Sequence, residues 1–308
     1  MTAIDLAPGR MTCVIGMHRS GTSFAARALS LLGVSLGDEG AMMPPGPDNP
    51  AGYWEIQRVK EFDDELLSHL GGAWDFPPVL SPGWEQDPAL DGYRERAAEV
   101  VREAFGPALG GDGPLAVKDP RVSLLLPFWR TVLPVHATVV MVRNPHEVAR
   151  SLGVRRYAVG PAQAAVLWIR YLFAATGNDP QHLLLRHQDF FDDLDGTLDR
   201  VVAHLGLAAP DGSTRAAVRA ALDPSLRHHD DRVEPNDDSP LMRLADLVWN
   251  GGRPDLSALP GEVTDALARG WLRGPLDDEA LTRARADVIR LKERVKQLNA
   301  AASASATP

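Results

Sequence analysis

A group of glycine, hydroxyl and arginine residues near the start of the chain has the composition of an anion-binding loop. It follows the apolar run 11–15 and leads into a segment with helical periodicity, so the loop joins a strand to the start of a helix. Helix starts present free backbone N–H groups that bind phosphate. Gly16 and Gly21 allow close backbone approach, and Thr22 and Ser23 add hydroxyl donors. The segment therefore predicts a cradle for a phosphate or a similar anion.

The same loop differs from that of nucleoside triphosphatases at one position. Gly16 and Gly21 have the spacing of the motif G-x-x-x-x-G-K-[ST], but Thr22 stands where the motif has lysine. The cation of the loop is Arg19, two positions before Gly21, where it would meet the bridging region of a 5′-phosphate. This departure argues against a triphosphate held with magnesium. The alternative without a ligand is an ordinary capped strand-to-helix turn.

Arg143 and Ser151 form a second candidate anion site. Arg143 follows the apolar run 137–142, and Ser151 stands eight residues later in a helix that opens at Pro145. A separation of about two helical turns lets the two side chains converge on a single phosphate. The alternative is that Arg143 pairs with a carboxylate and Ser151 is an ordinary helix residue.

Lys118 and Arg121 belong to a third polar group, the run Lys118-Asp119-Pro120-Arg121. It follows the apolar run 115–117 and reaches the same carboxyl edge of the predicted sheet, where ligands of open α/β folds bind. The alternative for Lys118 is an ion pair with a neighbouring carboxylate. Arg121 either binds a ligand or pairs with a surface acid.

These groups require a parallel sheet, because parallel strands bring successive strand ends to one edge. Four short apolar runs predict the strands, and each precedes a segment with helical periodicity: 11–15, 115–117, 137–142 and 182–185. The helices are predicted over 22–32, 55–70, 91–105, 145–152, 161–175 and 190–205. This alternation predicts an α/β fold of three layers, with helices on both faces of a parallel sheet.

Two segments dense in glycine and proline, 33–52 and 71–90, are long for connections in a compact domain. Long connections are often binding loops, so we expect both to border a ligand site. Their aromatic residues either line that site or pack in the core: Tyr53, Trp54, Trp74, Phe76 and Trp84. Glu55 follows the first loop at the predicted start of a helix, where an acid also complements the helix dipole.

Residues 276–308 differ from the rest of the chain, which we predict to form one domain over 1–275. The apolar residues from Leu281 to Leu298 follow alternating spacings of three and four, the seam of a coiled coil. This C-terminal helix either pairs with a second copy in a homodimer or packs on its own domain. The closing segment AASASATP is expected to be disordered.

Charge and composition exclude several classes of protein. The net charge of −9 argues against non-specific nucleic-acid binding, which needs clustered lysine and arginine. The one cysteine, Cys13, cannot form an internal disulfide, and His228 and His229 lack further ligands at metal-binding spacing, so no metal site is predicted. No uncharged apolar run reaches the roughly 20 residues that span a bilayer, and no signal-like stretch opens the chain. We expect a cytoplasmic protein without an integral membrane segment.

Together these groups resemble the sulfotransferases that use 3′-phosphoadenosine 5′-phosphosulfate (PAPS). One loop looks like the 5′-phosphosulfate loop of that family, with an arginine that tyrosylprotein sulfotransferases also carry instead of the more frequent lysine: Arg19-Ser20-Gly21-Thr22-Ser23. The counterparts of Arg143 and Ser151 hold the 3′-phosphate of PAPS in the family. Lys118-Asp119-Pro120 is similar to a run in tyrosylprotein sulfotransferases, whose lysine lies beside the transferred sulfuryl group. The resemblance covers about residues 11 to 230.

This resemblance implies a P-loop-NTPase-like sulfotransferase fold and a metal-independent enzyme. The enzyme would transfer a sulfuryl group from PAPS to a hydroxyl of a small-molecule or carbohydrate acceptor and release 3′,5′-adenosine bisphosphate (PAP). Glu55 would be the general base, with Arg19 and Lys118 bracing the sulfuryl group and the leaving phosphate. Arg227 would contact the 3′-phosphate.

The sequence excludes one mechanism of the family and leaves two rival functions open. Many cytosolic members of the family use a histidine two residues after the strand lysine, but here that position is Pro120. The rival enzyme is a P-loop kinase with a degenerate motif. The rival of another class is a non-catalytic partner protein that uses the nucleotide-binding fold as a scaffold.

Overall fold

The fold is built on one parallel sheet. The computed structural model describes residues 4–46, 49–153, 159–222 and 240–250 of the 308-residue chain. Within them, β1 (Met11–Gly16), β2 (Leu115–Lys118), β3 (Val135–Val142) and β4 (Leu183–Arg186) form a sheet of order β2-β1-β3-β4. All three neighbouring pairs are parallel. The four predicted strands are confirmed, and all of their carboxyl ends lie at one edge.

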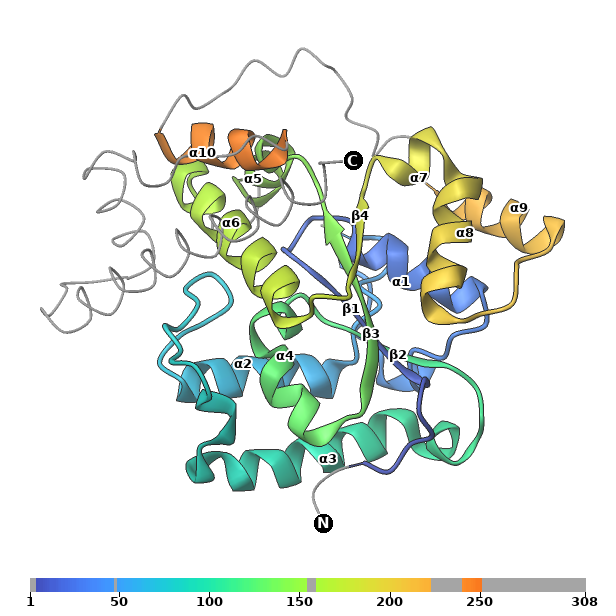
Figure 1. Ribbon diagram of the computed structural model, residues 1–308, viewed down its shortest axis with the longest axis horizontal. Coiled ribbons are helices and arrows are strands. Elements are labelled where there is room, and N and C mark those ends of the chain that lie inside the picture. Colours follow the sequence, from blue (N-terminus) through green and yellow to red (C-terminus); the bar gives the residue numbers. More distant parts are fainter. Residues whose placement is uncertain (1–3, 47–48, 154–158, 223–239, 251–308) are drawn as a thin grey trace, which may run out of the picture.

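Helices cover both faces of the sheet, as the sequence predicts (Figure 1). One face carries α2 (Gln57–His69), α3 (Asp91–Phe105), α4 (Val122–Val132), α5 (Pro145–Gly153), α6 (Pro161–Asn178) and α10 (Pro240–Trp249). The other carries α1 (Thr22–Leu31), α7 (Asp189–Asp192), α8 (Leu194–Leu205) and α9 (Gly212–Ala221). Short 3₁₀ turns lie at Glu39–Ala41, Trp84–Gln86, Pro88–Leu90 and Gly106–Gly110.

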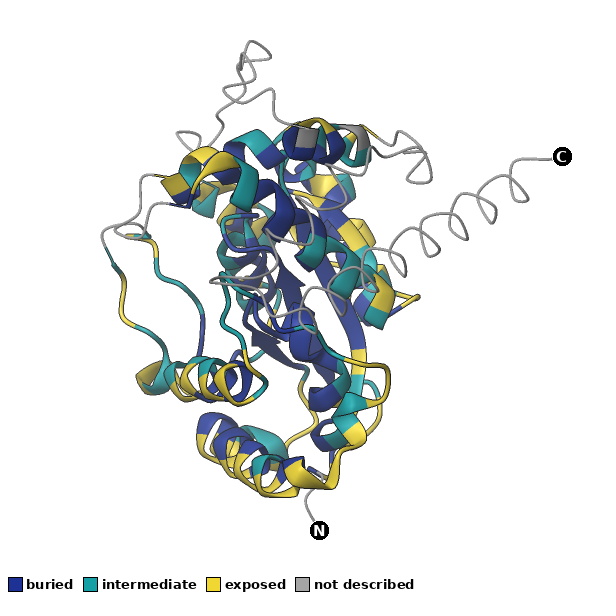
Figure 2. Ribbon diagram, turned by 90° about the vertical axis from the view of Figure 1, so that its left-hand side faces the viewer, coloured by how far each residue is buried: buried dark blue, intermediate teal, exposed yellow. Residues whose placement is uncertain are grey.

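Alternation along β1 produces two separate cores. Cys13 and Ile15 pack in one core, whereas Val14 packs in the other with Val139 and Met141 of β3. Successive side chains of a strand point to opposite faces, so a strand covered on both sides is apolar throughout. Every residue of β1 is buried, and the strands form the dark centre of Figure 2. The three predicted layers are therefore present.

Two predicted helices begin or end elsewhere. The helix predicted over 190–205 is wrong as a single element, because Asp193 interrupts it with a φ of −146°. The carboxylate of Asp193 accepts a hydrogen bond from the N–H of Gly196 at 2.9 Å and caps α8. The helix predicted from position 55 begins at Gln57 instead, which leaves Glu55 in the extended segment before it.

The sequence reading misses α4 because Pro127 lies inside it. Proline lacks the N–H that would bond the carbonyl four residues earlier, here that of Ser123. The side-chain amide of Asn178 donates to this carbonyl at 3.3 Å. Packing of the apolar residues of α4 on the sheet outweighs the local cost of the proline.

Gly16 permits a close approach of two strands at the functional edge. Its φ is +136°, and an added Cβ would lie 2.2 Å from the carbonyl oxygen of Met141. The N–H of Gly16 donates to Ser123 Oγ at 2.9 Å, which ties the end of β1 to α4. These two constraints fix where the loop after β1 begins.

None of the described helices combines the length and apolar character needed to cross a membrane. The predicted C-terminal helix, the domain boundary at 275 and Arg227 lie outside the described residues.

Gly16→Ala should unfold far more easily than the matched variant Gly33→Ala. Both glycines have positive φ, but an added Cβ at Gly33 meets nothing within 4 Å. Gly33→Ala should therefore cost about 1–2 kcal/mol from backbone strain alone. Gly16→Ala adds a backbone overlap and should cost about 4 kcal/mol or more. Urea unfolding of the two variants measures the difference, and equal losses would show that the contact with Met141 is unimportant.

Candidate functional site

One cavity brings together cations from three strand ends. Its volume is about 510 Å³, and Arg19, Lys118 and Arg143 all line it. These residues follow or end β1, β2 and β3. The wall also includes the segment 49–55 before α2 and residues at the end of α9. Parallel strand ends therefore deliver these cations to a common site, as their spacing predicts.

The loop after β1 leaves the start of α1 open to a ligand. Gly21 precedes α1 in the left-handed conformation, and no side chain caps the helix. The first turn of α1 contains no acidic residue. The first N–H groups of a helix lack partners inside it, so this end attracts an anion. Thr22 and Ser23 line the cavity here, whereas Gly16 and the fully buried Ser20 do not.

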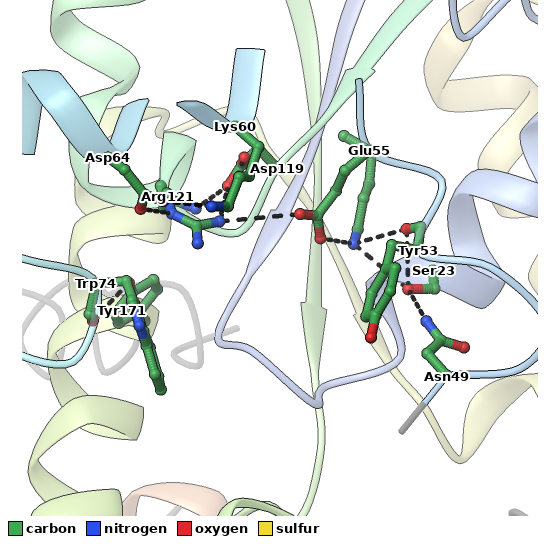
Figure 3. A network of polar contacts seen from close by, with 11 residues as sticks. Ser23, Asn49, Tyr53, Glu55, Lys60, Asp64, Trp74, Asp119, Arg121 and Tyr171 are labelled. Carbon is green, nitrogen blue, oxygen red and sulfur yellow. Dashed lines mark hydrogen bonds and ion pairs between the residues drawn. The ribbon is translucent and has the colours of Figure 1, made fainter. Parts of the chain in front are cut away.

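Lys118 holds three oxygen atoms at the floor of the cavity. Its Nζ donates to Glu55 Oε1 at 2.5 Å, to the carbonyl oxygen of Tyr53 at 3.0 Å and to Ser23 Oγ at 3.4 Å. Ser23 Oγ also accepts from Asn49 Nδ2 at 3.1 Å, as Figure 3 shows. Lys118 therefore forms an ion pair with a neighbouring carboxylate, the alternative role that the sequence offers. Lys118 and Glu55 both line the cavity.

The Lys118–Glu55 ion pair is almost fully removed from water. The side chains of Lys118 and Glu55 are 2% and 8% exposed. Burying two charges costs desolvation free energy that their attraction only partly offsets, so such a pair is weak evidence of a role in stability. Ionisable groups concentrated in a cavity are instead typical of a functional site.

A strained turn directs Glu55 toward Lys118. Trp54 has a φ of +58°, which is rare for a bulky residue other than glycine. Its ring N–H donates to the carbonyl oxygen of Ala51 at 3.2 Å. The carbonyl oxygen of Glu55 accepts from the N–H of Met43 at 2.8 Å. Glu55 is held by this paired segment and not by a helix dipole. Strain of this kind often accompanies a functional site.

Arg143 and Ser151, predicted to share one phosphate, each have another partner in the structure. Ser151 Oγ accepts from Arg19 Nε at 2.8 Å, whereas Arg143 Nε donates to the carboxylate of Glu147. Glu147 lies one helical turn beyond Arg143, a spacing that the sequence shows and that favours an ion pair. Arg143 thus pairs with a carboxylate, which was its alternative role, and its side chain also lines the cavity.

An aromatic end of the cavity was missed by sequence reasoning. Phe24, His187 and Phe191 line it, and the rings of His187 and Phe191 lie 5.2 Å apart. His187 follows β4, and its backbone N–H donates to the carbonyl oxygen of Val142 at 2.8 Å. An added Cβ at Gly21 would lie 2.4 Å from the His187 ring, so the ring rests against the loop after β1. The position of His187 directly after a predicted strand was the available signal.

The second glycine- and proline-rich segment, 71–90, contributes no residue to the wall of this cavity, and its place beside an acceptor stays a prediction. Trp74 instead packs on His18, with ring centroids 4.7 Å apart, and Trp84 stacks on Phe128. Arg170 donates to the carbonyl oxygens of Pro77 and Pro78 and anchors the segment to α6.

Two fully buried aspartates, Asp63 and Asp119, do not line the cavity. Burial raises the pKa of Asp119 to about 6, against the opposing effect of the Arg121 charge. Burial, with a further contribution from the charge of Asp119, raises the pKa of Asp63 well above its usual value. Asp63 Oδ1 accepts from the Trp129 ring N–H at 2.9 Å, whereas its Oδ2 has no hydrogen-bond partner. The described residues contain no group of acidic, histidine or cysteine side chains placed to hold a metal ion.

Asp63→Asn should change the pH dependence of stability. Because the pKa of Asp63 is raised by folding, the folded protein keeps a proton that the unfolded chain loses above about pH 4. The unfolding free energy of the unaltered protein should therefore fall, relative to that of Asp63→Asn, as the pH rises from 4 to 7. Denaturant unfolding across this range measures the difference. A constant difference would contradict the raised pKa.

The comparisons with known proteins identify similar solved structures. Neither a protein-family model nor a curated protein sequence matches the chain significantly. The chain is similar to the sulfotransferase STF1 from Mycobacterium tuberculosis H37Rv, with 16% identity, a TM-score of 0.45 and coverage of 71% of this chain and 73% of that one. The sulfotransferase domain of the Synechococcus PCC 7002 olefin synthase has 15% identity and a TM-score of 0.40 over 93% of this chain and 97% of that one. Retinol dehydratase in complex with retinol and PAP has 16% identity and a TM-score of 0.39 over 88% of this chain and 85% of that one.

Proposed function

We propose that this chain is a sulfotransferase that moves the sulfuryl group of PAPS to a hydroxyl of a small-molecule or carbohydrate acceptor. The observation that carries the proposal is the contact between Lys118 and Glu55 inside a cavity that Arg19 and the uncapped start of α1 also border. A carboxylate, a lysine ammonium and an anion cradle thereby lie around one space. These are the three groups that transfer of a charged group between oxygens requires.

The dimensions and charge of the cavity fit an adenosine with two phosphates. A volume of about 510 Å³ lies within the range of roughly 300–1,000 Å³ typical of ligand pockets. Among the described residues that line it, Glu55 is the one acid, against Arg19, Arg27, Lys118 and Arg143. This excess of positive charge favours a polyanion.

Different parts of the wall suit different parts of that ligand. The N–H groups at the start of α1, with Arg19, would hold the 5′-phosphate and the sulfuryl group. The rings of Phe24 and His187 would contact the base. Arg143 and the hydroxyl of Ser151 remain the candidates for the 3′-phosphate, with Glu147 as a carboxylate that this phosphate would displace from Arg143.

The proposed reaction is an in-line displacement at sulfur. Glu55 accepts the proton of the acceptor hydroxyl, and the hydroxyl oxygen forms a bond to sulfur. The bond between sulfur and the 5′-phosphate oxygen breaks, and its electron pair departs with PAP. Lys118 stabilises charge on the sulfuryl oxygens, and Arg19 stabilises the leaving phosphate. Protein cations here carry the role that magnesium has in phosphoryl transfer.

Transfer of label from PAPS tests this function directly. The protein is incubated with PAPS labelled in the sulfuryl group and with phenols, alicyclic alcohols and sugars in separate reactions without added metal. We expect label to enter at least one acceptor class with release of an equal amount of PAP. Absence of transfer to every acceptor, together with turnover of ATP in magnesium, would overturn the proposal in favour of a kinase.

Glu55→Gln should slow transfer strongly without weakening nucleotide binding. The amide keeps the shape of the side chain but cannot accept the proton, so the rate should fall by about 10²- to 10⁴-fold. Affinity for PAP, measured by calorimetry, should change little. The matched control is Glu61→Gln, because Glu61 is an exposed acid on α2. Normal turnover by Glu55→Gln would exclude Glu55 as the base.

A further inference from the structure

Arg121 lies next to the candidate base but outside the cavity wall. It is 6% exposed, and it is absent from the described residues that line the cavity. Its NH1 lies 3.9 Å from Glu55 Oε2, whereas Lys118 contacts the other oxygen, Oε1. The two cations therefore approach the Glu55 carboxylate at different oxygens, and Lys118 is the one on the cavity side.

Two acids hold Arg121 in place from behind. Asp119 Oδ1 accepts from the backbone N–H of Arg121 at 2.7 Å and from its NH1 at 3.1 Å. Asp64 accepts from Arg121 Nε, and its other oxygen lies 2.8 Å from Lys60 Nζ. Figure 3 shows Arg121 between these carboxylates and that of Glu55. Of the two alternatives that the sequence leaves for Arg121, pairing with an acid is present: Arg121 pairs with Asp64, which is 34% exposed, and also with the buried Asp119.

Removing these ionic groups from water costs desolvation free energy, and their mutual attraction adds little to the stability of the fold. Asp119 is fully buried, and an apolar group in place of a buried ion network is often equally stable. A guanidinium anchored at several nitrogens has one fixed orientation. Lys118, by contrast, is a flexible chain that the proposed reaction requires to engage the sulfuryl group.

We propose that Arg121 is a positioning residue that fixes Glu55 Oε2, so that Oε1 stays directed at the acceptor hydroxyl when Lys118 turns to the sulfuryl group. The inference rests on the proposed function, because it assigns Arg121 a part in proton acceptance by Glu55. Arg121 itself touches neither substrate. Loss of this support lets the carboxylate rotate away from the acceptor, and misplacement of a reacting group by about 1 Å can cost about 10²-fold in rate.

A double-mutant cycle between positions 121 and 55 tests the inference. Loss of sulfuryl label from PAPS, to acceptor or to water, is measured for the unaltered protein, Arg121→Met, Glu55→Gln and the double variant. Arg121→Met should lower kcat by about 10- to 100-fold, while KM for PAPS and affinity for PAP stay within about twofold. In the Glu55→Gln background, Arg121→Met should lower the rate by less than about twofold, because coupled residues are not additive. Arg121→Lys, which keeps the charge without the fork, should recover part of the rate.

A purely structural role for Arg121 gives a different result. Arg121→Met would then reduce the rate by the same factor in both backgrounds, together with PAP affinity, and that outcome overturns the inference. Arg94→Met is the control, because Arg94 is a buried arginine that holds the backbone at Glu85 and Asp87 away from the cavity. It should lower the unfolding temperature without changing the rate per folded molecule.

Asp64→Asn is a second variant that tests the same inference if Arg121→Met does not fold. Asp64 is 34% exposed and contacts Arg121 from the side opposite Glu55. Asp64→Asn should lower kcat severalfold in the unaltered background and leave the rate of Glu55→Gln unchanged. Equal effects in both backgrounds would again overturn the inference. If the unaltered protein neither binds PAP nor loses label from PAPS, the proposed function fails and the inference falls with it.

Discussion

The parallel register of β2, β1 and β3 is the constraint on which the whole site depends. Because these strands run side by side in one direction, their carboxyl ends open onto the same edge. Arg19, Lys118 and Arg143 are far apart in sequence and share one cavity for that reason. The close approach of Gly16 to Met141 fixes β1 against β3, and the hydrogen bond from Gly16 to Ser123 fixes the end of β1 against α4. Any change in register would separate the cations.

Concentrating these charges has a cost that the two cores offset. Lys118, Glu55, Asp119 and Arg121 are all nearly removed from water, and Asp63 adds a carboxyl with an unpartnered oxygen. Burial of apolar side chains on both faces of the sheet stabilises the fold and offsets the free-energy cost of removing these charges from water. The two sides of this network contain different cations. Its cavity side contains a flexible lysine with several oxygen partners, and its interior side contains an arginine fixed by two acids.

The fold and the positions of the main cations follow from the sequence, because apolar runs and strand-end polar groups are local signals. Contacts between distant segments do not. The pairing of Ser151 with Arg19 joins positions 132 residues apart, and no local pattern indicates it. Pro127 prevents the prediction of α4 from the sequence. The carbonyl of Ser123, which Pro127 leaves without its helical partner, accepts a hydrogen bond from the side chain of Asn178 in α6. The contact of Arg121 with Glu55 depends on the turn at Trp54, a left-handed bulky residue that tertiary packing must impose.

We propose that the cavity binds an adenosine with phosphates at both the 3′ and 5′ positions. Calorimetric titration with PAP, 5′-AMP and ATP with magnesium tests it most directly, because it needs no acceptor. We predict that PAP binds one site per chain in metal-free buffer. We also predict that it binds at least about tenfold tighter than 5′-AMP, since a charge-assisted contact to the 3′-phosphate contributes about 1.5 kcal/mol or more. Equal affinity for PAP and 5′-AMP, or tighter binding of ATP with magnesium than of PAP, would contradict the account.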